Sequence, residues 1–204
     1  MSSQLVDLGV AVTRDAPVVQ GEASWLSQDG WVLSVSSSYQ IGAPRQWTEG
    51  IVQVAKAWQP SENWQLQANL IHYRYPSSDS SARALDRTEF GGTLMFRDVL
   101  TLNAWTLELA HRPGGLRSEA DAGLRWPLTT RLSASAALGV AQYLAPRSWY
   151  PGNKRPDWFS YGHTGLRWDD GPWQVEILHI TSNFRRTRYE FPVAPWVTTV
   201  ARRF

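Results

Sequence analysis

The chain has 204 residues, no cysteine, twelve tryptophans and a formal net charge of +2. The absence of cysteine excludes a disulfide-stabilised scaffold and a thiolate metal site, and the small net charge gives no reason to expect nucleic acid as a partner. No segment approaches the roughly 18 consecutive apolar residues that a transmembrane helix needs, so a helical membrane protein is excluded as well.

Apolar and polar residues alternate from the first segment of the chain onward. In residues 4–13, Val6, Leu8, Val10 and Val12 alternate with polar or small residues. A period of two is typical of a β-strand, because successive side chains of a strand point to opposite faces of the sheet. The pattern therefore predicts an all-β protein.

The same alternation predicts twelve strands in a single domain over residues 1–204. All twelve prolines fall between the predicted strands or at their ends, as expected for a residue that cannot donate a ladder hydrogen bond. In chain order the predicted strands cover residues 4–13, 19–27, 31–41, 48–58, 64–75, 87–97, 99–111, 117–126, 130–144, 158–168, 173–183 and 195–204.

The predicted connections alternate between short and long. Short turns fall at 27–30, 59–63, 97–98, 127–129 and 169–172, and longer loops separate them. Transmembrane barrels combine short periplasmic turns with longer external loops and an even number of strands. We therefore expect a closed antiparallel transmembrane β-barrel of about twelve strands in the outer membrane of a Gram-negative bacterium, with both termini on the periplasmic side.

Tryptophans gather near the short turns, as expected for an aromatic girdle at a membrane interface. The predicted interface belt consists of Trp25, Trp31, Trp58, Trp64, Trp126, Trp168 and Trp173. A second aromatic set lies near the long loops and consists of Tyr39, Trp47, Tyr73, Tyr75, Tyr143, Trp149, Tyr150, Trp158 and Trp196.

The last predicted strand ends in an aromatic residue, Phe204. A terminal aromatic that closes an alternating strand is similar to the insertion signal of outer-membrane barrels, which predicts the barrel-insertion machinery as a partner. No signal peptide precedes the first patterned segment, so this prediction treats the sequence as a mature form.

Short motifs along most of the chain resemble the proteobacterial family of small TorF-like porins. They are Pro17-Val18-Val19-Gln20-Gly21 followed by Gln28-Asp29-Gly30-Trp31, Tyr73-Arg74-Tyr75-Pro76 followed by Glu89-Phe90, Asp157-Trp158 before Gly165, Asp170-Gly171, and the closing residues Val200 to Phe204. The resemblance implies a small outer-membrane barrel with a channel role. It implies no substrate and no catalytic residue.

If the apolar alternates face lipid, seven acidic and seven arginine side chains face inward. The predicted lumen-lining residues are Glu89, Arg117, Glu119, Asp121, Arg125, Arg131, His163, Arg167 and Glu176, with Asp7, Glu22, Glu49, Arg87, Arg97 and Arg203 completing the inward charges. Because the predicted strands that carry them are neighbours, we expect Arg117, Arg125, Arg131 and Arg167 to pair with Glu119 and Asp121. The equal numbers of inward charges predict weak ion selectivity.

The predicted function is passive passage of small solutes through an outer-membrane channel of the porin type, without cofactor, metal or catalysis. One alternative is a non-conducting structural or interaction barrel with a plugged lumen. Another is a lipid-modifying outer-membrane enzyme, but His179 and Ser182 have a spacing that places them on opposite faces of a strand. Basic loop residues could contact the phosphates of lipopolysaccharide, namely Arg147, Lys154, Arg155, Arg185, Arg186 and Arg188.

Overall fold

The computed structural model describes residues 1–13, 15–42, 46–76, 86–110, 115–144, 157–185 and 191–204. No helix in these ranges has the length and apolar character needed to span a bilayer. The strands are β1 (Val6–Asp7), β2 (Val10–Ala11), β3 (Val18–Leu26), β4 (Trp31–Gln40), β5 (Gln46–Ser61), β6 (Trp64–Arg74), β7 (Arg87–Phe96), β8 (Leu100–Leu109), β9 (Arg117–Pro127), β10 (Leu132–Gln142), β11 (Trp158–Asp170), β12 (Trp173–Ser182) and β13 (Trp196–Arg202).

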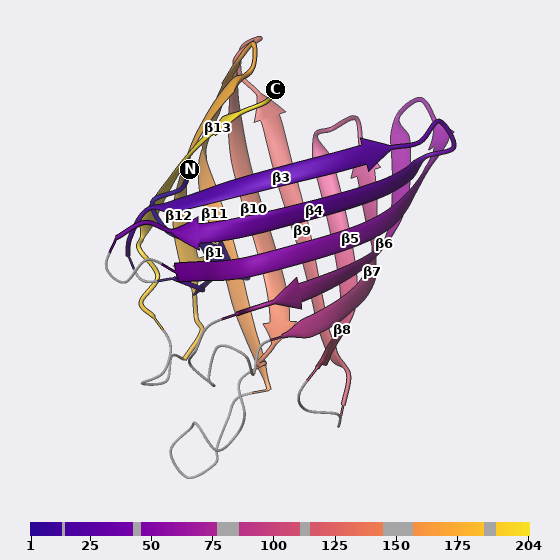
Figure 1. Cartoon of the computed structure of the whole chain (residues 1–204). Helices are drawn as coiled ribbons and strands as arrows, with labels where there is room; N and C mark the ends of the chain where they lie inside the picture. Colours follow the sequence, from indigo (N-terminus) through magenta and orange to yellow (C-terminus); the bar gives the residue numbers. More distant parts are fainter. Residues whose placement is uncertain (14, 43–45, 77–85, 111–114, 145–156, 186–190) are drawn as a thin grey trace.

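Strands β3 to β13 form one antiparallel sheet in which every strand pairs with its sequence neighbours. The sheet curves around a concave inner face (Figure 1). The prediction of an all-β antiparallel fold is confirmed, and the connections between β3 and β4, β5 and β6, β7 and β8, β9 and β10, and β11 and β12 are short, as predicted. These short turns and the C-terminus lie toward the same, upper end of the sheet in Figure 1.

The turn between β7 and β8 shows how one of the short connections is made. Arg97 and Asp98 both have positive φ, at 50° and 55°, and the Val99 N–H donates to the carbonyl of Phe96 at 2.9 Å. Two successive residues with positive φ give a turn whose twist matches that of the flanking strands.

The first predicted strand, over residues 4–13, is wrong. Leu8 and Gly9 adopt positive φ, at 50° and 69°, and reverse the chain, so that β1 pairs with β2 in a separate two-stranded hairpin. The alternation of Val6, Leu8 and Val10 fits a long strand and a tight hairpin equally well, because both have a period of two. The main sheet therefore has eleven strands rather than twelve.

The two edge strands of the sheet, β3 and β13, do not form a ladder with each other, yet both bond to the first residues of the chain. Ser2 exchanges two backbone hydrogen bonds with Val18, each 2.8 Å long. On the other side, the Ser3 N–H donates to the Thr198 carbonyl at 2.9 Å, and the Val200 N–H donates to the Met1 carbonyl at 2.8 Å. The segment of residues 1–3 thus satisfies backbone groups on both edges.

The register assigns each strand residue to one of two faces. On β6, Leu66, Ala68 and Leu70 lie on the outer face, opposite Leu94, Gly92 and Phe90 of β7. The intervening residues Gln65, Gln67 and Asn69 point inward. Small residues make room for large inward side chains, as where Trp105 lies against Gly91.

We predict that Gly9→Ala destabilises the protein, because the substitution forces an L residue into positive φ. The added Cβ would lie 2.5 Å from the Cβ of Tyr161 on the sheet. The expected loss is about 1–3 kcal/mol of unfolding free energy, measured by denaturant titration in detergent micelles.

Gly21→Ala is the matched control for Gly9→Ala. A Cβ at Gly21 meets no atom within 4 Å, so this variant should change the unfolding free energy by less than about 0.5 kcal/mol. Equal losses for the two variants would contradict the placement of the hairpin against Tyr161.

Candidate functional site on the inner face of the sheet

Polar side chains joined by hydrogen bonds line the middle of the inner face. Gln53 and Gln67 both donate to the amide oxygen of Asn69, at 2.9 and 2.6 Å. Farther along the sheet, Thr93 donates to Asn103 at 2.7 Å, and Asn103 donates to the Asp121 carboxylate at 2.8 Å. The first series joins β5 to β6 and the second crosses β7, β8 and β9, so this part of the inner face is a polar wall rather than a hydrophobic core.

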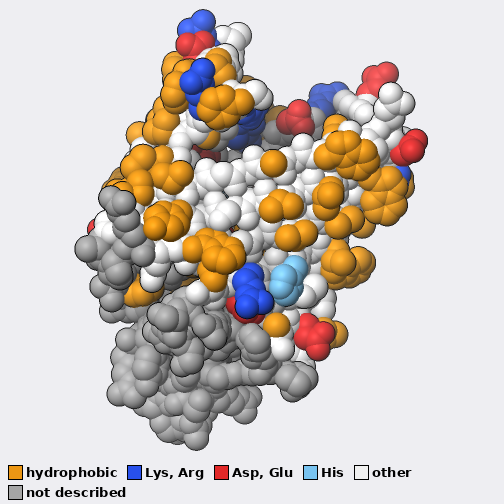
Figure 2. Space-filling view, viewed as in Figure 1, with side chains coloured by type: hydrophobic (Ala, Val, Ile, Leu, Met, Phe, Trp, Pro, Cys, Tyr) orange, Lys and Arg blue, Asp and Glu red, His pale blue; other side chains and the backbone are white. Residues whose placement is uncertain are grey.

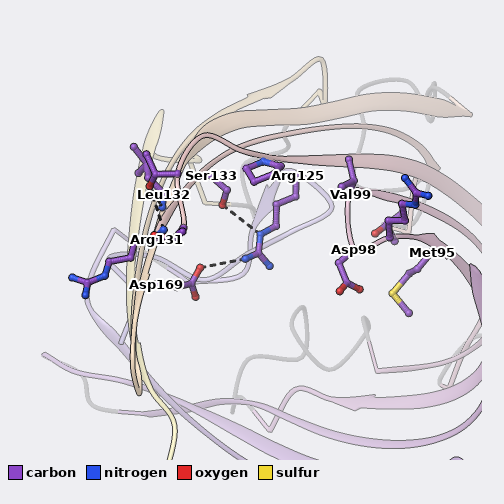
Figure 3. A pocket seen from close by; sticks show the side chains of 13 residues that line it. Met95, Asp98, Val99, Arg125, Arg131, Leu132, Ser133 and Asp169 are labelled. Carbon is purple, nitrogen blue, oxygen red and sulfur yellow. Dashed lines mark hydrogen bonds and ion pairs between the residues drawn. The ribbon is translucent and has the colours of Figure 1, made fainter. Parts of the chain in front are cut away.

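Most of the predicted lumen-lining residues lie on this inner face. The strand registers place eight of them there, namely Glu89, Arg117, Glu119, Asp121, Arg125, His163, Arg167 and Glu176. Arg131 differs from the prediction. Its side chain is 64% exposed, pairs with Asp170 at 3.4 Å, and points away from the inner face in Figure 3.

The predicted pairing of these arginines with Glu119 and Asp121 is not observed. Arg125 and Arg167 both bond to Asp169, at 3.3 and 2.9 Å, and Asp121 accepts from Asn103. Arg117 lies two residues from Glu119 on the same face of β9, yet no ion pair joins them. For Arg125 the reason is distance along the strand. Glu119 and Arg125 share a face of β9 but are six residues apart, which is about 20 Å.

The hairpin of β1 and β2 packs against the inner face near the end of the sheet that carries the long connections. Leu8 and Val10 contact a buried cluster of Ala141, Tyr143 and Phe159. The ring of Tyr143 packs edge-on against that of Phe159, with centroids 5.0 Å apart. Apolar burial of this kind holds the hairpin to β10 and β11.

Other contacts tie the N-terminal segment to the chain that precedes β13. The side-chain amide of Gln4, itself buried, donates to the carbonyls of Thr13 and Pro192 at 3.0 and 2.9 Å, and its oxygen accepts from the Ala194 N–H. Ala11 forms an isolated bridge with Phe191.

A buried arginine joins the hairpin to the opposite part of the wall. Arg87, only 2% exposed, donates to Asp7 at 2.6 Å, to Glu89 at 2.5 Å and to the Tyr75 hydroxyl at 2.8 Å. Its guanidinium also lies over the ring of Tyr73, 4.0 Å from the centroid. We call these five residues the Arg87 cluster. Three donated bonds and an aromatic face satisfy the guanidinium in a site shielded from water.

Two further carboxylates lie beside the Arg87 cluster. Glu49 on β5 is 4% exposed and interacts with Asp7 and Tyr75. Glu119 on β9 is 7% exposed and interacts electrostatically with Asp7 and Glu89. The Oε2 atom of Glu119 has no hydrogen-bond partner in the described part of the chain.

A pocket of about 530 Å³ opens at the end of the sheet that carries the short turns. Figure 3 shows Arg125 directed toward Ser133 and Asp169 on one wall, with Asp98 and Met95 across the opening. The arginines of this end are therefore far from the buried carboxylates, which lie near the starts of β5, β7 and β9.

The outer face of the sheet is largely apolar, and the outward residues in the middle of the described strands carry no charge. Large hydrophobic side chains such as Leu70, Phe90 and Leu138 are 49%, 64% and 68% exposed. Figure 2 shows such side chains spread over the face of the sheet, with charged ones toward its ends. The outward charges of the described strands are Lys56, Arg74, Glu108, Asp170 and Arg202. Lys56 lies opposite Trp31, the first residue of β4, and each of the others lies at or next to a strand end.

All seven tryptophans of the predicted belt are exposed on the outer face, with exposed fractions between 37% and 60%. Each lies near the end of its strand that carries a short turn.

The second aromatic set is split between the two faces of the sheet. Tyr39, Trp47, Trp158 and Trp196 are exposed, whereas Tyr73, Tyr75 and Tyr143 point inward. Trp149 and Tyr150 lie outside the described residues, as do Arg147, Lys154, Arg155, Arg186 and Arg188 of the predicted lipopolysaccharide contacts.

The His179 and Ser182 side chains lie on opposite faces of β12. His179 packs against Trp196 on the outer face, with ring centroids 4.8 Å apart, while Ser182 is opposite the inward Tyr161. In the described ranges no three His, Asp or Glu side chains are grouped so that they could hold a metal ion.

The Arg87 cluster could not be recognised from the sequence. Arg87, Glu89 and Asp7 appear there as three inward charges among many, and Tyr73 and Tyr75 as members of the second aromatic set near the long loops. The one available signal is the Leu8-Gly9 pair inside an alternating segment, because a glycine within a strand pattern often marks a turn or a close approach.

The chain matches no protein-family model and no curated protein.

We predict that Arg87→Met is strongly destabilising. The substitution keeps much of the side-chain volume but leaves the half-buried carboxylate of Asp7 and the buried one of Glu89 without their cation. Removing one partner of a buried ion pair costs about 3–5 kcal/mol, measured as the change in unfolding free energy in detergent. Arg131→Met is the control, since its pair with Asp170 is exposed and should contribute less than about 1 kcal/mol. A small effect at Arg87 would contradict its role as the centre of the cluster.

Proposed function

We propose that this protein is a bacterial outer-membrane β-barrel that lets small solutes pass through a polar interior. In this proposal the eleven-stranded sheet and residues 1–3 form a closed ring across the membrane, with the short turns in the periplasm. The observation that carries the proposal is the uncharged and largely apolar middle of the outer face, from β3 to β13.

The physical reason is the cost of exposing apolar surface to water. A sheet surrounded by water normally has a polar outer face and an apolar inner one, whereas the two faces of this sheet are reversed. Lipid is the surrounding that makes both faces favourable, since the apolar side chains contact acyl chains and the backbone groups between paired strands are satisfied within the sheet.

The tryptophans at the short-turn end support the same proposal. Trp25, Trp64 and Trp173 each place an indole on the outer face at a strand end, where the ring can lie in lipid and its N–H at the headgroups. The resemblance of the short motifs to TorF-like porins agrees with an outer-membrane location.

A second candidate function is a barrel that conducts nothing. The position of the hairpin favours it, because Asp7 and Leu8 bind the inner face from β7 to β11 and occupy part of the interior. In that case the barrel would serve as a structural element or bind a partner through its loops or turns. Conductance separates the two functions.

We predict that the refolded protein forms small ion-conducting channels in planar lipid bilayers. We also expect Asp7→Asn to increase the conductance or the frequency of openings. Weakening a charge-assisted hydrogen bond costs about 2 kcal/mol, which raises the fraction of protein with a displaced hairpin by at least roughly tenfold.

Asp29→Asn provides the matched control, because Asp29 is an exposed acid in the turn between β3 and β4. It should leave the conductance unchanged. Absence of conductance in both the wild type and the Asp7→Asn variant would contradict the channel function. If the wild type does not conduct and the Asp7→Asn variant does, the result would favour the plugged barrel.

A further inference from the structure

The charges on the inner face are separated along the strands, although their total is balanced. Arg125 and Arg167 lie at the short-turn end, where both bond to Asp169. The buried carboxylates lie toward the other end. A balanced sum therefore does not describe the field that a solute would meet along its path.

Four carboxyl groups from four separate segments interact electrostatically with the Arg87 guanidinium. Asp7 comes from the hairpin, Glu49 from β5, Glu89 from β7 and Glu119 from β9. Arg87 bonds to Asp7 and Glu89. Glu49 and Glu119 form no ion pair with the described residues, so these two acids share the Arg87 charge without a cation of their own. The other inward groups nearby are Arg117, near the start of β9, and Asp121, which bonds to Asn103.

The Glu119 side chain points independently to a missing positive partner. It is 7% exposed, and its Oε2 atom accepts no hydrogen bond from the described part of the chain. A buried acceptor without a partner is costly, and a cation that enters the site would remove that cost. Trp105 lies opposite Glu119 in the ladder of β8 and β9 and faces inward, which adds an aromatic surface that also favours cations.

We propose that the carboxylates of Asp7, Glu49, Glu89 and Glu119 form a cation-selective constriction, and that the solutes are small monovalent or organic cations. This inference rests on the proposed channel function. The described residues contain no group suited to holding a metal ion, so the site would attract passing cations rather than chelate one. Because Asp7 belongs to the hairpin, the N-terminal segment supplies one of the selecting charges.

The test is the reversal potential of the refolded protein in a planar bilayer with a tenfold gradient of KCl. We expect K⁺ to be preferred over Cl⁻ by at least about threefold. Glu49→Gln and Glu119→Gln replace a carboxyl group by an amide of nearly the same shape, and each should lower the permeability ratio by about half or more. Glu108→Gln is the control, because Glu108 lies on the outer face near the end of β8 and should leave the ratio unchanged.

Each result bears on one of the two proposals. A channel that conducts both ions equally, or prefers Cl⁻, would overturn the cation inference and leave the channel function in place. A K⁺ preference that survives both glutamate substitutions would also overturn it, since the selecting charges would then lie elsewhere. Absence of conductance in every variant would contradict the channel function itself, and the inference would fall with it.

Discussion

Backbone groups at a sheet edge need hydrogen-bond partners, and in a lipid environment each unsatisfied group costs several kcal/mol. In this protein the edges of β3 and β13 share the same partners, the backbone groups of residues 1–3. The chain that follows is thereby directed from the edge to the inner face, where Gln4 bonds to Thr13 and Pro192. The position of the hairpin thus depends on how the edges are satisfied.

The hairpin in turn determines the electrostatics of the interior. Asp7 reaches Arg87 on β7, while Leu8 and Val10 pack on β10 and β11, so the segment links parts of the wall that are four strands apart. A buried guanidinium is tolerated only when its donors are satisfied, and one of its two carboxylate partners comes from the hairpin. Stability and the charge of the interior are therefore coupled at one residue, Arg87.

Local patterns predicted most of the sheet, because a period of two and the placement of prolines are properties of short segments. Predicted residues 64–75 and 87–97 correspond to β6 at Trp64–Arg74 and β7 at Arg87–Phe96. The prediction failed at residues 4–13, where a hairpin has the same alternation as a strand. The predicted ion pairs also failed. Alternation places Glu119 and Arg125 on the same face of β9, but it does not give the distance between them along the strand. The Arg87 cluster joins residues 80 positions apart and depends on tertiary contacts that no local pattern contains.

We propose that this sheet spans a membrane with its apolar face toward lipid and its polar face toward water. The chain has no cysteine, so single cysteines along β6 can each carry a nitroxide label without interference. In bilayers, the outward labels should be accessible to oxygen, which dissolves in lipid; they are at Leu66, Ala68 and Leu70. The inward labels should be accessible to a water-soluble nickel chelate; they are at Gln65, Gln67 and Asn69. This account predicts strict alternation between the two reagents, residue by residue. Access of the nickel chelate to both sets would contradict a membrane-spanning sheet.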